Sequence, residues 1–144
     1  MKLVKQISIF VENKYGRLAE ILTTIGEHNI DISALSIADT TDFGILRMIV
    51  NNPEEAAAVL KEQGMAVKLT DVLALAVPDT PGGLAKELVK LRDAGITIEY
   101  MYAFIGKSEE GAMVIVRVKH PEKALEVLQD KDVCVMDCEE VYRL

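Results

Sequence analysis

The chain has 144 residues, half of them hydrophobic, and a formal net charge of −7. This length accommodates one average domain or two small ones, and it buries enough apolar surface to fold without a disulfide or a metal ion. The acidic charge disfavours binding to nucleic acid or to acidic membrane surfaces, so we expect neither as a partner. No apolar run approaches the roughly 20 residues of a membrane span, and the first residues lack a signal-peptide pattern, so the sequence predicts a cytoplasmic protein.

Apolar periodicity in the first half of the chain predicts an alternation of strands and helices. The expected elements, in chain order, are a strand over 4–12, a helix carried by Leu18, Leu22 and Ile25 that ends within 26–29, strands over 30–39 and 45–51, a helix that begins at Asn52-Pro53 and ends at Gly64, and a strand over 66–70. Asn caps free backbone N–H groups and Pro is tolerated in the first helical turn, which fixes the start of the second helix.

The second half predicts the same order. Its expected elements are a strand over 71–77, a helix carried by Leu84, Leu88 and Leu91 that ends at Gly95, strands over 97–105 and 113–119, a helix that begins at His120-Pro121, and a last strand over 134–142. Residues 106–111 predict a longer hairpin loop between two of these strands. Cys134 and Cys138 both fall in the predicted last strand, about 13 Å apart. We therefore expect no disulfide and no shared metal, but two reduced thiols that are buried or half-buried.

The two halves superpose as an internal repeat. An offset of 66 aligns the first part of each half and matches Val11 with Val77, Gly16 with Gly82 and Leu18 with Leu84. An offset of 68 aligns the rest and matches Val50 with Val118 and Pro53 with Pro121. The order strand-helix-strand-strand-helix-strand, present twice, predicts an α+β fold of two ferredoxin-like repeats over 1–70 and 71–144. Each repeat places its helices on one face of an antiparallel sheet.

The segment between the first strand and the first helix of each half is the place where a ligand would bind. A helix start offers unpaired N–H groups and a positive dipole end, which favour a carboxylate. Gly16, Gly82 and Gly83 carry no side chain that would block close approach of a ligand. Each segment taken alone also fits an ordinary tight turn.

The combined motifs are more specific than any single turn. Asp79-x-Pro81-Gly82-x-Leu84 followed by Gly95-Ile96-Thr97-Ile98 resembles the ACT family, and Asn13-x-x-Gly16-x-Leu18 with Asn29-Ile30-Asp31-Ile32 matches it in the first half. The resemblance covers essentially the whole chain and is to small stand-alone proteins of two ACT repeats. It implies a regulatory protein that binds a free amino acid and passes the signal to a metabolic enzyme.

The resemblance also implies a ligand site between two domains packed side by side. Carried over, the ligand-binding positions are Asn13, Gly16, Arg17, Leu18, Asp31 and Ile32 in the first half, and Asp79, Gly82, Gly83, Leu84, Thr97 and Ile98 in the second. The backbone N–H groups of 16–18 are expected to hold the ligand carboxylate, and Asp31 its ammonium group. Asn13 meets a polar end of the ligand.

Two departures from the family pattern predict unequal sites. Tyr15 stands where the loop commonly has proline, and Thr97 stands where the first half has Asp31. We expect the two sites to differ in occupancy or affinity.

One predicted strand carries an unusual row of aromatic residues. Alternation places Ile98, Tyr100, Tyr102 and Phe104 on one face of the strand over 97–105. The row fits a specificity wall or a domain interface, and it fits equally one side of a packed sheet.

Catalytic and metal-binding patterns are weak. His28 and His120 lie at helix ends with no nucleophile or metal triad placed beside them, so we expect no catalytic residue, no metal and no cofactor. The expected partners are the amino acid, a second copy of the chain or a regulated enzyme. The alternative is an interaction or oligomerisation module that binds no ligand.

Overall fold

The computed structural model describes residues 3–39, 42–105 and 111–143. Apart from Gly111, the loop expected over 106–111 lies outside these residues. The chain forms two compact units. The N-terminal unit comprises Lys5–Thr70 with residues 142–143, and the C-terminal unit comprises Asp71–Val141 with residues 3–4.

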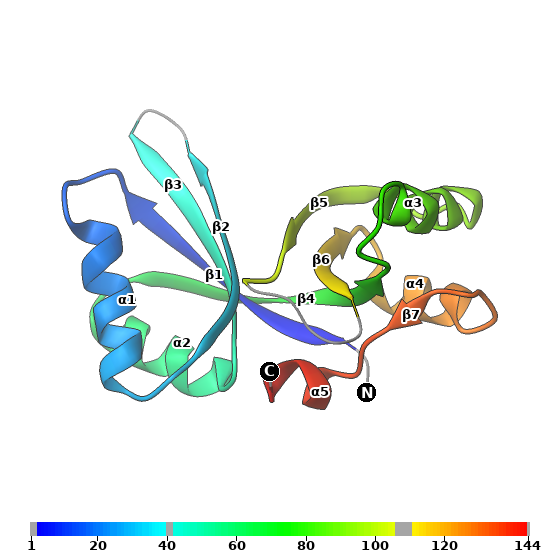
Figure 1. The fold of residues 1–144 in the computed structure, drawn as a ribbon. Coiled ribbons are helices and arrows are strands. Elements are labelled where there is room, and N and C mark those ends of the chain that lie inside the picture. The colour runs from blue at the N-terminus through cyan, green and yellow to red at the C-terminus, as the bar shows by residue number, and fades with distance from the viewer. Residues whose placement is uncertain (1–2, 40–41, 106–110, 144) are drawn as a thin grey trace. The chain divides into compact units, whose positions relative to one another are not determined.

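The N-terminal unit contains four strands and two helices (Figure 1). Its elements are β1 (Val4–Glu12), α1 (Arg17–Glu27), β2 (Ile32–Asp39), β3 (Phe43–Val50), α2 (Pro53–Glu62) and the first part of β4 (Ala66–Val77). The strand order is β2-β3-β1-β4, and β3 runs antiparallel to both of its neighbours. This is the arrangement that the repeat pattern predicts.

The C-terminal unit repeats the plan (Figure 1). It contains the rest of β4, α3 (Gly83–Asp93), β5 (Ile98–Ala103), β6 (Ala112–Val118), α4 (Pro121–Leu128), β7 (Cys134–Val135) and α5 (Cys138–Tyr142). Strand β4 lies between β7 and β6, and β5 forms the edge beyond β6. The prediction of two ferredoxin-like repeats is confirmed.

Each unit has its own core, in which alternate strand residues meet one face of the helices. In the N-terminal unit the core joins Ile7 and Ile9 of β1 to Ile21 and Ile25 of α1. In the C-terminal unit Leu73 and Leu75 of β4 pack with Leu91 of α3 and Leu128 of α4. A helix must bury its apolar stripe against another element, and here the sheet supplies that surface.

The C-terminal end differs from its prediction. Only Cys134–Val135 pairs with β4, and the chain then turns into the short helix α5. The cause is Asp137, whose Oδ1 accepts a hydrogen bond from the backbone N–H of Glu139 at 3.1 Å and starts the helix. The same bond lowers the pKa of Asp137. Both cysteines are free, and Cys138 is half-buried as predicted, but Cys134 is exposed. The expectations of a single last strand and of a covered Cys134 are therefore wrong.

Strand irregularities also alter two sequence expectations. The strands expected separately over 66–70 and 71–77 form one continuous strand, β4. A register shift between Ile98 and Tyr100 turns Ile98 toward Val118 on the core face, while Tyr100 faces Arg117. The prediction that Ile98 shares one strand face with Tyr100, Tyr102 and Phe104 is therefore wrong for Ile98.

Among the described residues, no helix has the length and apolar character needed to cross a membrane.

Candidate functional site

The two loop–helix junctions share one backbone geometry. Gly16 precedes α1 with φ of 77° and Gly82 precedes α3 with φ of 79°, a left-handed conformation that glycine adopts without strain. No side chain in the described ranges caps either helix. The first helical N–H is used within the loop, because Arg17 donates to the Lys14 carbonyl at 3.1 Å and Gly83 to the Thr80 carbonyl at 2.9 Å.

The junction of the N-terminal unit opens onto a hollow of about 150 Å³. Its lining comprises Val11, Glu12, Asn13, Lys14, Arg17, Leu18, Ile37, Gly44 and Leu46. Three of the predicted ligand-binding residues, Asn13, Arg17 and Leu18, thus meet at one hollow. The N–H groups of Leu18 and Ala19 have no partner among the residues that the structure describes. They can receive an anion at the positive end of α1.

Ion pairs hold the charged side chains around this hollow. Lys14 Nζ lies 2.7 Å from a Glu12 carboxylate oxygen, and its hydrogen bond lowers the pKa of Glu12. Arg17 donates to Glu20 at 3.1 Å. All four side chains are substantially exposed, so these pairs position the loop more than they stabilise the fold.

The junction of the C-terminal unit is tighter. A Cβ at Gly83 would lie 2.1 Å from the carbonyl oxygen of Pro78, so the loop closes directly over the first residue of α3. The equivalent of Gly83 in the N-terminal unit is Arg17, which has a full side chain. Asp79 and Gly82 are exposed, and Leu84 is 36% exposed. The two junctions therefore share a backbone plan but offer different surfaces.

The predicted ligand-binding residues at the starts of β2 and β5 differ in burial. Asp31 and Thr97 are exposed, while Ile32 and Ile98 pack against the cores of their units. The backbone N–H of Asp31 donates to Asn51 Oδ1 at 3.1 Å, and Asn51 N–H donates back to the Asp31 carbonyl at 3.1 Å. These bonds fix the backbone and leave the Asp31 carboxylate at the surface.

Within one unit the two halves of the predicted site lie at opposite ends of the sheet. The end of β1 and the end of β2 meet at the start of β3, because Glu12 is opposite Phe43 and Asp39 is opposite Gly44. The start of β2 lies at the far end, about 24 Å away at about 3.4 Å per residue. A single unit therefore does not bring Asn13 and Asp31 to one ligand.

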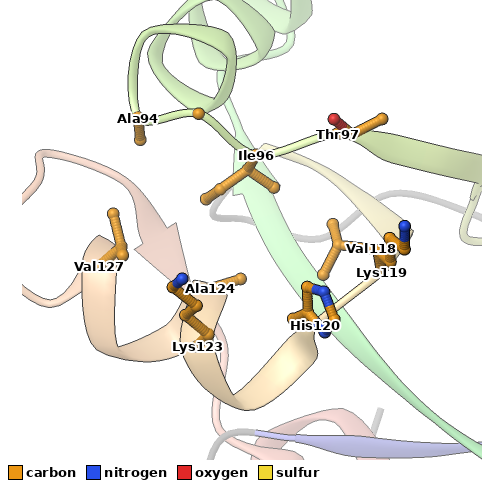
Figure 2. A pocket seen from close by; sticks show the side chains of 10 residues that line it. Ala94, Ile96, Thr97, Val118, Lys119, His120, Lys123, Ala124 and Val127 are labelled. Atoms are coloured by element: carbon orange, nitrogen blue, oxygen red, sulfur yellow. The ribbon is translucent and has the colours of Figure 1, made fainter.

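A second hollow, at the junction of β6 and α4, escaped the sequence interpretation (Figure 2). It has a volume of about 170 Å³ and is lined by Ala94, Gly95, Ile96, Thr97, Val118, Lys119, His120, Lys123, Ala124 and Val127. Comparison of the two repeats shows a change of residue type that could have indicated it. The offset of 68 aligns the basic residues Lys119, His120 and Lys123 with Asn51, Asn52 and Glu55. Thr97 belongs to the ACT-like motif described above, whereas Lys119, His120 and Lys123 lie outside it.

Both histidines lie at helix ends. His28 Nδ1 lies 2.9 Å from the Thr24 carbonyl at the end of α1, and His120 precedes α4. In the described part of the chain, no group of three His, Cys, Asp or Glu side chains is placed to hold a metal ion.

Comparison with known proteins identifies the fold and the family. A family model for the ACT domain pair matches residues 2–144. The crystal structure of protein BT0572 from Bacteroides thetaiotaomicron is 43% identical, covers 99% of this chain and 98% of its own, and has a TM-score of 0.91. The regulatory subunit of aspartate kinase from Thermus thermophilus is 19% identical over 88% of this chain and 91% of its own, with a TM-score of 0.63. That from Thermus flavus is 15% identical over 96% and 90%, with a TM-score of 0.59. No curated protein matches the chain.

Proposed function

The chain belongs to the family of ACT domain pairs, and from this premise we propose that it is a cytoplasmic regulatory protein that binds a free amino acid. The ligand lies between two ACT repeats. It contacts the loop–helix junction of one repeat and the start of the second strand of another. The protein performs no catalysis itself, and ligand binding changes the conformation that a partner enzyme recognises.

The hollow beside α1 is the observation that carries this proposal. Asn13, Arg17 and Leu18 line it, and the N–H of Leu18, which bonds to none of the described residues, lies at the start of a helix. An amino acid has a carboxylate that suits this positive helix end. The Asn13 side-chain amide adds a group that donates to the ligand or accepts from it.

The second anchor must come from another repeat. Asp31 offers a carboxylate for the ligand's ammonium group, through a charge-assisted hydrogen bond. Because it lies at the opposite end of its own sheet from Asn13, each ligand set is completed by a second module. That module is the other repeat of the same chain or a repeat of a second copy.

The two ligand sets are proposed to be unequal. The set built on Gly82, Gly83 and Leu84 has a loop closed over its helix start by Pro78. Thr97 in that half supplies a hydroxyl where the other half has the Asp31 carboxylate. A ligand with both a carboxylate and an ammonium group therefore prefers contacts with Asn13 and Asp31.

The partner in this proposal is a metabolic enzyme. Two structural neighbours are regulatory subunits of aspartate kinase, which supports an assembly of this module with an enzyme of amino-acid metabolism. A ligand controls such a partner only if it binds two conformations with different affinity.

A second candidate function is an interaction module that binds no ligand. The rings of Phe10 and Phe43 stack with centroids 5.0 Å apart and remain 54% and 42% exposed. Both belong to the strand surface opposite the helices, because Phe10 alternates with the core residue Ile9. Exposed aromatic pairs of this kind favour contact with another protein.

Thermal denaturation of the whole protein against each of the twenty amino acids tests the proposal. A ligand at one hundred times its dissociation constant adds about 2.7 kcal/mol of stability, which raises the midpoint by about 2–8 °C. We expect one amino acid, or a chemically related few, to produce this rise.

Two variants connect the rise to the site. Asp31→Asn and Asn13→Ala should each weaken the response, whereas Asp130→Asn, an exposed aspartate outside the candidate sets, should leave it unchanged. Absence of a response to any amino acid would overturn the sensor and favour the interaction module. A response that survives both variants would place the ligand elsewhere.

A further inference from the structure

We propose that the hollow at the β6–α4 junction of the C-terminal unit binds a small anion, with a carboxylate or phosphate group held by Lys119, His120 and Lys123. These three residues lie outside the candidate amino-acid site, although the hollow shares Thr97 with it. The inference does not depend on the proposed function.

The hollow has an apolar floor and a basic wall. Val118 is 1% exposed and Ala124 is 4% exposed, and together with Ile96 and Val127 they form the apolar part. Figure 2 shows Ile96 pointing into the space above α4, and Lys123 and Val127 pointing from α4 toward the same space. His120 lies beside Val118 at the start of the helix. A floor of this kind with a few converging polar groups is typical of small-molecule sites.

Among the described residues, the basic side chains of this hollow have no protein partners. Neither the two lysines nor His120 makes a side-chain hydrogen bond or ion pair with any residue in the described ranges. The lining contains no carboxylate. Asp71 and Glu122 appear only in the wider depression of about 460 Å³ that adjoins it and also includes Lys119, His120 and Lys123. An anion in the inner hollow therefore meets cationic side chains first.

The equivalent place in the N-terminal unit shows that folding does not require these charges. There Asn52 caps α2 by accepting from the Glu55 N–H at 3.4 Å, and its Nδ2 donates to the Glu55 carboxylate at 2.8 Å. Asn51, the counterpart of Lys119, bonds the backbone of Asp31. In one unit the junction satisfies its own polar groups, and in the other it presents cations and an uncapped helix start.

The size of the hollow restricts the ligand class. A volume of about 170 Å³ is smaller than the roughly 300–1,000 Å³ of pockets for drug-sized ligands, which favours a small ion. A dicarboxylate or a phosphate fits this space, whereas a nucleic acid does not. The net charge of −7 also opposes any long polyanion. Lysine provides a point charge that suits either a phosphate or a carboxylate.

Amide NMR titration of the whole protein tests the inference, with inorganic phosphate and succinate as separate probes and neutral succinamide as the control. We expect one of the anions to shift the amide signals of Val118 to Ala124 in a saturable way, and which one does so distinguishes the two chemistries. Succinamide should leave these signals unchanged.

The variants exchange residues between equivalent positions of the two repeats. The triple change Lys119→Asn, His120→Asn and Lys123→Glu gives this junction the residues of the N-terminal unit, and we expect the dissociation constant to rise by about tenfold or more. The single change Lys123→Glu serves if the triple variant fails to fold. Lys86→Glu, an exposed lysine in the first turn of α3, makes the same charge change away from the hollow and should have little effect.

Three results would overturn the inference. One is the absence of a saturable shift with both anions. Another is unchanged affinity in the triple variant or, where that does not fold, in Lys123→Glu. A third is an equal loss in Lys86→Glu, which would mean that only overall charge matters. Amino-acid binding that depends on Asn13 and Asp31 would be unaffected by any of these results, so the two proposals fail separately.

Discussion

Residues 21 and 87 occupy the same place in the two units, on the inner faces of α1 and α3. Ile21 is 1% exposed within an apolar core. Glu87 is 7% exposed, and one of its carboxylate oxygens, Oε2, is buried with no hydrogen-bond partner in the described part of the chain. Its other oxygen accepts from Lys90 Nζ at 3.0 Å, which raises the pKa of Lys90. The same fold thus tolerates a core isoleucine in one unit and a partly satisfied ion pair in the other.

The position of the lysine explains how the C-terminal unit accepts the carboxylate. Lys90 also donates to the Asp132 carbonyl at 2.7 Å, so it connects α3 to the loop that follows α4. Its counterpart in the N-terminal unit is Thr24, which carries no charge. The C-terminal unit therefore places a lysine beside the carboxylate, and the N-terminal unit has an uncharged residue at that position.

The largest effect is expected when the carboxylate is moved to the unit that lacks the lysine. Ile21→Glu buries a charge with no cationic partner at the equivalent position, and we expect a loss of about 3–5 kcal/mol in the free energy of unfolding. Urea denaturation measures the loss, and amide hydrogen exchange shows whether the N-terminal unit opens first.

The reciprocal variant is the control for this comparison. Glu87→Ile removes the unsatisfied oxygen and gives the C-terminal unit the residue of its partner, so it should be neutral or stabilising by about 1–2 kcal/mol. A large loss in Glu87→Ile would contradict the view that the carboxylate is tolerated rather than required. A small loss in Ile21→Glu would contradict the asymmetry itself.

The loop–helix junctions give the next effect. Gly83→Ala places a Cβ 2.1 Å from the Pro78 carbonyl oxygen, so the loop must move, at a cost of about 2–3 kcal/mol. Gly26→Ala is the control, because Gly26 lies in α1, where an added Cβ meets no described atom within 4 Å beyond its chain neighbours and the adjacent helix backbone, and alanine favours the helix by about 1 kcal/mol. Thermal denaturation should move in opposite directions for the two variants, and a shared direction would argue against a closed loop at Gly83.

The sequence predicted most elements because periodicity and capping act locally. Leu18, Leu22 and Ile25 marked α1, and Asn52 with Pro53 marked the start of α2, where the Asn52 side chain does cap the helix. The prediction of a last strand is wrong because the apolar residues near Val135 and Val141 fit a strand, whereas Asp137 caps a helix and begins α5. The hydrogen bond to Asp137 favours a helix, and the apolar alternation after Val135 is too short to favour a strand over it.

The candidate site could be predicted only in part, for a geometric reason. Sequence motifs identified the junctions at Gly16 and Gly82, which the structure forms with matching backbone angles. The strand-helix-strand order already places the start of β2 at the opposite end of the sheet, because α1 returns the chain to the end where β1 begins, and the strand pairing agrees with this. The bulge that turns Ile98 toward the core is different, because a strict period of two does not predict it.

The smallest effect concerns the second helix of each unit. Asn52→Ala removes a side-chain cap and should cost about 1 kcal/mol, whereas His120→Ala should change stability little, because His120 makes no capping bond to α4. Urea denaturation in a buffer without phosphate or carboxylates measures both variants on the protein alone. An equal loss in the two would mean that His120 stabilises the helix start, and the argument that this junction keeps its polar groups for an anion would lose its basis. A clear loss in Asn52→Ala alone would show that equivalent junctions divide between helix capping in one unit and an exposed cationic surface in the other.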